Sequence, residues 1–207
     1  MPNVEIMALG AYQTNCYLVW KESSGSCAVI DPGYFPEQVL SRVKELGKKV
    51  DAVLLTHGHF DHVGAVRGIA EATRCRVWMH ERDYSQFKNP TNLYFYPLAN
   101  CDTPEIHFCE EGEAIPAGGL TFQVMETPGH TWGSVCYRCE DALFTGDTLF
   151  EGSCGRTDLP GGSSRDLGES LERLRDLEED FRVYPGHGSA TTLSREKQFN
   201  PYLRGIL

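Results

Sequence analysis

Short apolar runs alternate with amphipathic stretches along most of the chain, which is typical of strands that alternate with helices. The run Ala52-Val53-Leu54-Leu55 is apolar throughout, which indicates a strand buried on both faces. Bounded runs rich in β-branched or aromatic residues predict further strands. We expect these at residues 4–9, 16–20, 27–30, 76–79, 120–126, 135–139, 142–144 and 182–184.

Three stretches show helical periodicity. The first begins near Pro36 and ends at Gly47, since proline favours the first helical turn and glycine the position after the last. Residues 65–73 and 165–179 are the other two, and leucines recur at helical spacing in the latter. Sheets with helices outside them predict an α/β sandwich, organised as a single domain over residues 1–207.

Two stretches interrupt this regularity. Residues 89–104 contain three prolines and an aromatic run, and residues 151–164 are rich in glycine and serine. Neither is typical of a domain linker, because strong element signals resume on both sides, and long loops in a compact domain are often lids or binding loops.

The net charge of −10 counts against a nucleic-acid binder, because such proteins neutralise phosphates with lysine and arginine. It favours an enzyme that acts on a small molecule. No secretory signal or membrane span is expected, so we predict a cytoplasmic protein whose eight cysteines stay reduced. Cys136 and Cys139 have CxxC spacing, but in a strand their sulfurs would lie on opposite faces. The oligomeric state stays open.

The densest chemical signal follows the buried strand at residues 52–55. His57 and His59 lie two residues apart, so in an extended loop both imidazoles point the same way and can bind one ion. Asp61 and His62 would then turn toward a neighbouring position. Solvated polar residues in a loop are the ordinary alternative, but four ligand types in six positions favour metal binding.

Three more candidate ligands follow predicted strands, each after a glycine: His130, Asp147 and His187. Each alone indicates only a turn. Because α/β proteins tend to place sites at one edge of their sheets, we expect these residues to meet there. His80 and His107 lack such a setting and are expected to be ordinary surface or core histidines.

The sequence from Thr56 to His62 resembles the HxHxDH signature of the metallo-β-lactamase superfamily, and the remaining ligands follow in the family's order. The resemblance implies a four-layer αββα sandwich with metals at one edge. It is closest to the glyoxalase II-like branch, through Phe144–Phe150, Gly155–Asp158 and Pro185–Gly188. It assigns one metal to His57, His59 and His130, the second to Asp61, His62 and His187, and a bridging role to Asp147. Only twenty residues follow His187, so the chain resembles a short form without the helical region that helps hold glutathione.

The resemblance implies a hydrolase in which two divalent cations, zinc first and iron or manganese as alternatives, activate a bridging hydroxide. A thioester of the hydroxyacylglutathione class is the expected substrate, because a thiolate leaves without much help from an acid. Asp61 is either the proton acceptor or a plain ligand. In resembling enzymes a basic residue at the position of Arg156 binds a glutathione carboxylate, although pairing with Asp158 is equally expected. Tyr94 and Tyr96 are candidate pocket walls.

Three other functions remain open. Persulfide dioxygenases also resemble Gly155–Asp158 but use a single iron with open positions for dioxygen. A nuclease is disfavoured by the negative charge and the lack of a basic run. A binding module stabilised by metal should have a closed, saturated site, whereas this ligand set resembles an open one.

Overall fold

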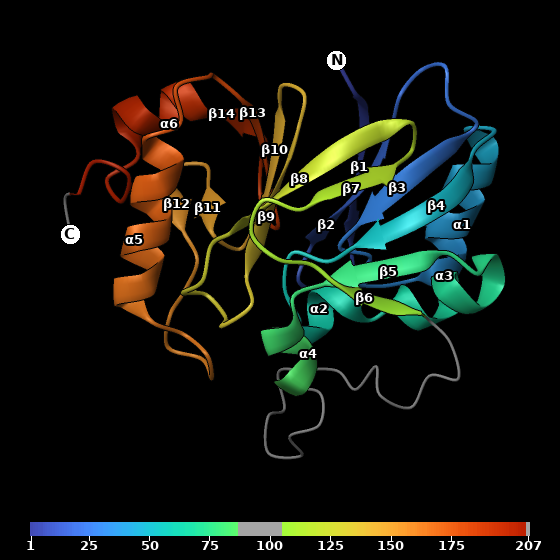
Figure 1. The fold of residues 1–207 in the computed structure, drawn as a ribbon, viewed down its shortest axis with the longest axis horizontal. Helices are drawn as coiled ribbons and strands as arrows, with labels where there is room; N and C mark the ends of the chain where they lie inside the picture. Colours follow the sequence, from blue (N-terminus) through green and yellow to red (C-terminus); the bar gives the residue numbers. More distant parts are fainter. Residues whose placement is uncertain (87–104, 206–207) are drawn as a thin grey trace.

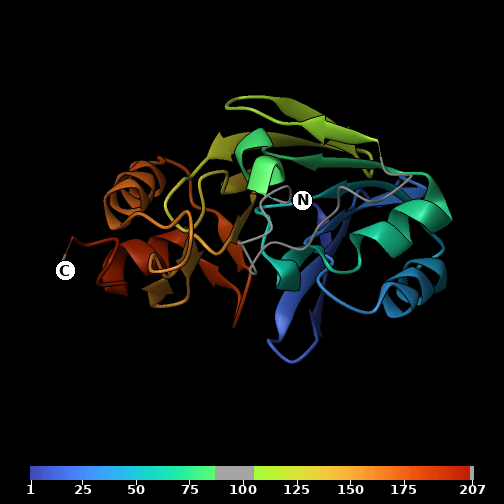
Figure 2. The ribbon, with the colours of Figure 1, turned by 90° about the horizontal axis from the view of Figure 1, so that it is seen from below.

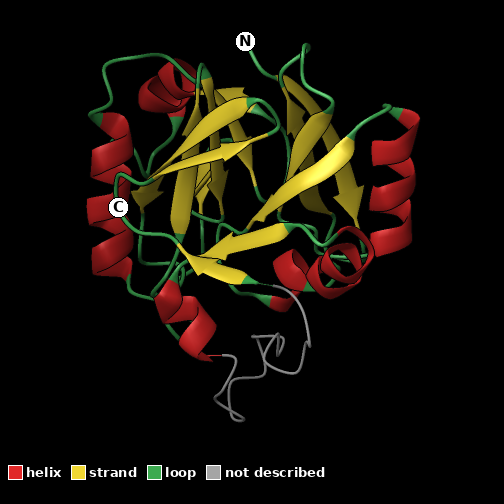
Figure 3. Ribbon diagram, turned by 45° about the vertical axis from the view of Figure 1, so that its right-hand side comes forward, coloured by secondary structure: helices red, strands yellow, loops and turns green. Residues whose placement is uncertain are grey.

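Two six-stranded sheets pack face to face in the computed structural model, and helices cover the outer face of each (Figures 1 and 3). The structure describes residues 1–86 and 105–205. The predicted loop at 89–104, with Tyr94 and Tyr96, therefore lies outside the described residues.

The first sheet has the order β1-β2-β3-β4-β5-β6. Its first three strands pair antiparallel, and β3 to β6 pair parallel because helices connect them along the chain. The strands are β1 Asn3–Leu9, β2 Thr14–Trp20, β3 Ser26–Ile30, β4 Lys49–Leu54, β5 Arg76–Met79 and β6 Ile106–Phe108.

The second sheet has the order β14-β13-β10-β9-β8-β7 and is antiparallel except where β10 meets β13. A two-stranded hairpin, β11 with β12, follows β10. The strands are β7 Ala114–Ala117, β8 Leu120–Glu126, β9 Val135–Cys139, β10 Ala142–Gly146, β11 Leu149–Phe150, β12 Ser153–Cys154, β13 Arg182–Pro185 and β14 Thr191–Thr192.

The helices form the two outer layers, with α1 and α3 beside the first sheet and α5 and α6 beside the second (Figure 2). Ser163 caps α5, its Oγ accepting a hydrogen bond from the backbone N–H of Asp166. None of the described helices is long and apolar enough to cross a membrane. The helices are α1 Pro36–Glu45, α2 Phe60–Val63, α3 Val66–Thr73, α4 Glu81–Gln86, α5 Ser164–Arg175 and α6 Leu193–Phe199.

The core consists of three apolar clusters that alternate with the two sheets. Strand β4 shows why, because Val53 faces the cluster under α1 and α3 while Ala52 and Leu54 face the cluster between the sheets. In β9, Cys136 faces α5 and Cys139 the space between the sheets, which confirms the predicted opposite faces. The cysteines of the described residues are free thiols. The predicted αββα sandwich is therefore confirmed.

Two local predictions need correction. The helix expected at 165–179 ends at Arg175, although Leu177 still packs against the same cluster and so extended the apparent periodicity. The extended backbone expected at His57 and His59 is followed by a short helix that begins at Phe60. Several short elements were not predicted, because segments of two to seven residues carry too few positions to show a period. They are the strands β6, β7, β11, β12 and β14 and the helices α2, α4 and α6.

Candidate metal centre

The ligand-type residues of the His57–His62 motif straddle the start of helix α2. His57 and His59 precede the helix in extended backbone, with His59 at the N-cap position. Asp61 and His62 lie within the helix, so they point away from the direction set by the two histidines. One short segment therefore serves two adjacent positions, as the sequence predicted. The ligands are divided between two positions because the backbone turns into a helix at Phe60.

The other three candidate ligands come from the second sheet. His130 follows β8, Asp147 follows β10 directly and His187 follows β13. All three side chains lie at the same edge as the His57–His62 motif, within 3.5 Å of at least one of its members or of each other. The convergence expected at one edge of the sheets is thus present in the fold.

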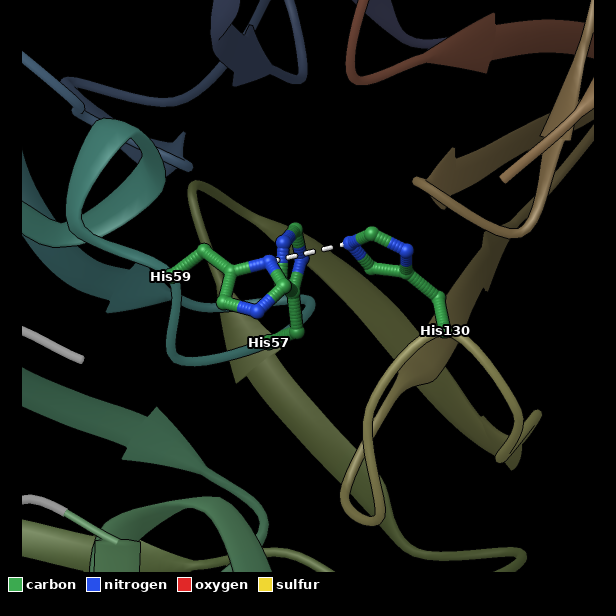
Figure 4. Close-up of side chains that lie close together, drawn as sticks. All are labelled: His57, His59 and His130. Atoms are coloured by element: carbon green, nitrogen blue, oxygen red, sulfur yellow. Dashed lines mark hydrogen bonds between the residues drawn. The ribbon is translucent and has the colours of Figure 1, made fainter. Parts of the chain in front are cut away.

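Three histidines form the first group. Ligand atoms of His57, His59 and His130 lie within 4.8 Å of one another, and all three side chains are buried. Figure 4 shows their rings pointing toward a common space, with His57 and His59 on one loop and His130 on another. The distance from His130 Nε2 to His59 Nδ1 is 3.0 Å.

The second group consists of Asp61, His62 and His187. Nε2 of His187 lies 3.4 Å from Nε2 of His62 and 3.4 Å from Oδ2 of Asp61. Asp147 lies between the two groups, since its Oδ2 is 3.5 Å from Nε2 of both His130 and His187. Its Oδ1 is 3.4 Å from Nε2 of His62. This carboxylate therefore approaches both groups.

The donor atoms that face this space fit divalent cations. Nε2 of His57 and Oδ1 of Asp147 are buried and have no hydrogen-bond partner among the described residues. An unpartnered buried polar atom usually costs about 1–3 kcal/mol, so these two atoms, one belonging to the three-histidine group and the other beside His62, call for a ligand. Imidazole nitrogens with carboxylate oxygens, and no thiolate, suit zinc, iron or manganese.

The outward nitrogens of four candidate ligands are held by the protein. Nδ1 of His57 lies 3.0 Å from Thr56 Oγ1, and Nδ1 of His130 lies 2.8 Å from the carbonyl oxygen of Arg156. Nδ1 of His187 lies 3.1 Å from the carbonyl oxygen of Tyr12. Nδ1 of His62 lies 3.0 Å from Asp31. Such contacts fix each ring with Nε2 turned inward, which is the usual arrangement around a bound metal.

Asp31 is a functional residue that the sequence reasoning missed. Its buried carboxylate also accepts hydrogen bonds from the backbone N–H and hydroxyl of Thr56, at 2.8 and 2.6 Å. It thereby supports His62 directly and His57 through Thr56. In the sequence Asp31 precedes Pro32-Gly33 and indicates only a turn. Its φ of 49° agrees with a turn, and no signal there points to histidines at least 26 positions away.

Histidine pKa values shift in opposite directions in the two groups. Burial, reinforced by the neighbouring histidines, holds the pKa of His57 well below its usual range and lowers that of His59 to about 3. Burial also opposes protonation of His62, but Asp147 and Asp31 outweigh it and raise its pKa to about 9. For Asp61, burial raises the pKa, and the hydrogen bond from His187 with the charge of His62 lowers it below the usual range. His57 and His59 are thus neutral and ready to bind a cation.

A pocket of about 610 Å³ opens onto both groups. Its other walls are mainly apolar, with Tyr12, Phe60, Phe150 and Leu159 among them, and Arg156 supplies a cationic side chain. Arg156 also makes a two-pronged ion pair with Asp158, with both N···O distances 2.6 Å. Of the two roles expected for Arg156, the ion pair with Asp158 is present. Arg156 also lines the pocket, so the ion pair is compatible with a contact to a substrate.

The match to a family model covers most of the chain. Residues 9–187 match the model described as the metallo-beta-lactamase superfamily. The chain belongs to the metallo-β-lactamase superfamily. A curated relative, hydroxyacylglutathione hydrolase GloC of Haemophilus influenzae, is 38% identical over 97% of this chain and 98% of its own.

Solved structures agree with this membership. BLEG-1, a B3 metallo-beta-lactamase, superposes with a TM-score of 0.84 at 34% identity, covering 97% of this chain and 99% of its own. The di-iron-bound form of TTHA1623 gives 0.82 at 37% identity, with coverage of 96% and 99%. ETHE1 from Myxococcus xanthus gives 0.80 at 31% identity, with coverage of 98% and 85%. These relatives establish the fold and a metal-dependent superfamily, and they differ in what they are named for.

Proposed function

We propose that the protein is a metal-dependent hydrolase that cleaves a thioester of the hydroxyacylglutathione class in the cytoplasm. His57, His59 and His130 would hold one divalent cation and Asp61, His62 and His187 a second, with Asp147 shared between them. Zinc is the first candidate metal. The observation that carries this proposal is the position of Asp147, whose two oxygens approach both histidine groups.

Two divalent cations bound by these residues would make a water molecule more acidic and would polarise a carbonyl oxygen. The residues of this chain provide the setting for that chemistry. Asp61 keeps its carboxylate ionised, since its pKa lies below the usual range, and can accept a proton from an attacking water. A thiolate needs little protonation to leave, so cleavage of a thioester makes little demand on a general acid.

Substrate recognition would combine the apolar wall with one cation. Phe150 and Leu159 can pack against the acyl and thiol carbon chains, while Arg156 is placed to bind a carboxylate of a glutathione-like leaving group. GloC, similar over nearly the whole of both chains, is named for such a reaction. The negative net charge and free thiols agree with a small-molecule enzyme of a reducing compartment and with no nucleic-acid partner.

The test pairs metal analysis of protein purified without added metals with hydrolysis of a hydroxyacylglutathione thioester. The proposal predicts two metal equivalents per chain and release of free thiol that stops when the metals are chelated. Hydrolysis of a β-lactam in place of the thioester would contradict the substrate class while leaving the metal centre standing. Thiol release that continues after chelation would contradict the mechanism itself.

A mononuclear-iron persulfide dioxygenase is the second candidate. The di-iron-bound relative favours it in one respect, because a chain 37% identical to this one accommodates iron. A dioxygenase would contain one iron per chain and consume oxygen when given a glutathione persulfide. Oxygen uptake without thioester hydrolysis would therefore replace the hydrolase proposal.

A further inference from the structure

Asp83, on helix α4, is a fully buried carboxylate with three hydrogen-bond donors around it. Its Oδ2 accepts from the backbone N–H of Gly58 and from the hydroxyl of Thr131, both at 2.8 Å. Its Oδ1 accepts from the backbone N–H of Gly133 at 2.7 Å. Its exposed fraction is 0%, so these bonds are not shared with bulk solvent. A carboxylate buried this deeply is normally retained only where its hydrogen bonds are complete.

The three donors belong to the two loops that carry the three-histidine group. Gly58 lies between His57 and His59, and Thr131 directly follows His130. A Cβ added at Gly133 would lie 2.8 Å from Asp83 Oδ1, so the loop reaches the carboxylate only because that residue is glycine. Asp83 therefore bonds one loop to the other.

We propose that Asp83 is a positioning residue that fastens these two loops together and so sets the metal affinity of the three-histidine group. The inference rests on the ligands assigned under the proposed function and not on the choice of substrate. The two loops carry His59 and His130, and the fastening holds His59 Nδ1 at 3.0 Å from His130 Nε2. Without the fastening, a cation would have to order both loops as it binds, and that ordering would weaken its affinity.

The effect should be confined to one of the two groups. His62 is held by Asp31, and the Pro185–Gly188 loop is held by Asn15, whose side chain donates to the carbonyl oxygens of Pro185 and Gly188 at 3.0 and 2.9 Å. None of these bonds passes through Asp83. The second group thus keeps its own supports when Asp83 changes.

The decisive variant is Asp83→Asn, which keeps the size of the side chain. One of the two carboxylate oxygens becomes an amide NH2 group, so an N–H donor of the asparagine then faces the backbone N–H of either Gly133 or Gly58. We expect one of the two zinc equivalents to bind about 10–100-fold more weakly, the range usual for partners that support metal ligands. The measurement is a zinc titration of metal-free protein in competition with a chelator.

Glu196→Gln is the matched control. Glu196 is also fully buried and also accepts from a backbone N–H, that of Gly152 at 2.7 Å, and from a hydroxyl, that of Thr191 at 2.7 Å. Its loss should lower the melting temperatures of the metal-free and zinc-loaded proteins alike. Asp83→Asn should also shrink the difference between those two temperatures, because weaker binding stabilises the folded state less.

A second pair of variants covers the case in which Asp83→Asn does not fold. Thr131→Val removes one donor to Asp83 with little change in shape, and Thr131→Ser restores the hydroxyl. We expect Thr131→Val to weaken the same zinc equivalent and Thr131→Ser to recover it. Wild-type affinity in a folded Asp83→Asn or Thr131→Val protein would overturn the inference, as would an equal loss in Glu196→Gln. A wild-type chain that binds no zinc would overturn the proposed function instead.

Discussion

Gly186 lies directly before His187, and its Cα faces the carboxylate of Asp147. A Cβ added there would lie 2.2 Å from Asp147 Oδ1 and 2.8 Å from His62 Cε1. The φ of Gly186 is not among the positive values, so alanine is acceptable to the backbone and its methyl group is the whole perturbation. Gly186→Ala therefore tests the position of Asp147 without altering a ligand.

The size of the effect follows from the contact distance. An ordinary contact of 3.4 Å requires Asp147 Oδ1 to retreat by about 1.2 Å from its 2.2 Å position. A misplacement of about 1 Å in a reacting constellation costs roughly 100-fold in rate, so kcat/KM for the thioester should fall by about that factor. Overpacking should lower the free energy of unfolding of the metal-free protein by about 1–3 kcal/mol.

The assay compares turnover and bound metal in Gly186→Ala with those in Gly168→Ala. A Cβ at Gly168 meets nothing within 4 Å, and this glycine lies within α5, so alanine there should stabilise the protein by about 0.5–1 kcal/mol without touching the site. Full metal content with normal turnover in Gly186→Ala would refute the reasoning, because it would show that Asp147 is not needed where the structure has it.

Three further predictions test single groups. Asp147→Asn should lower the zinc content and reduce turnover at least about 100-fold in a folded protein, because an amide lacks the negative charge that two cations would share. Unchanged zinc content in this variant would contradict the prediction. Arg156→Ala should raise KM for a glutathione thioester with little change in kcat, and an equal effect on a thioester without carboxylates would rule out recognition. In metal-free protein the pKa of His62 is raised to about 9. Protonation of His62 therefore stabilises the folded state fully below the unfolded pKa of 6.5, and this stabilisation is lost as pH rises through 9. Denaturant titrations between pH 6.5 and 8 should show this decline, and His62→Gln should reduce it to the part that the raised pKa of His187 contributes.

The parts of the fold that could be predicted are those with many residues in one period. The helix from Pro36 to Glu45 and the doubly buried strand β4 each carry enough apolar positions to fix both their type and the layers they face. The convergence of the candidate ligands was equally accessible, because ligand-type residues followed strand ends beside glycine. Local sequence was sufficient wherever the determining residues were neighbours.

What could not be predicted is the support around those ligands. Asp31 lies 25 positions before Thr56, and Asp83 lies 50 positions before Gly133, yet each pair is joined by a hydrogen bond. A lone aspartate before a turn or in a six-residue helix has no periodicity that reveals its partner. Its role depends on which loops the sheet topology brings beside it, and that is a property of the tertiary fold.

Further hydrogen bonds join the two sheets at the edge that carries the candidate site. At this edge the backbone N–H of Val135 donates to the carbonyl oxygen of Thr56, and that of Asn15 to Gly186, both at 2.8 Å. The hydroxyl of Thr14 donates to Asp61 Oδ2 at 3.1 Å, which ties the first strand pair to a candidate ligand. The sheets are thus joined at this edge by hydrogen bonds within the protein. A site preorganised in this way leaves the binding energy of its metals available for orienting and polarising a substrate.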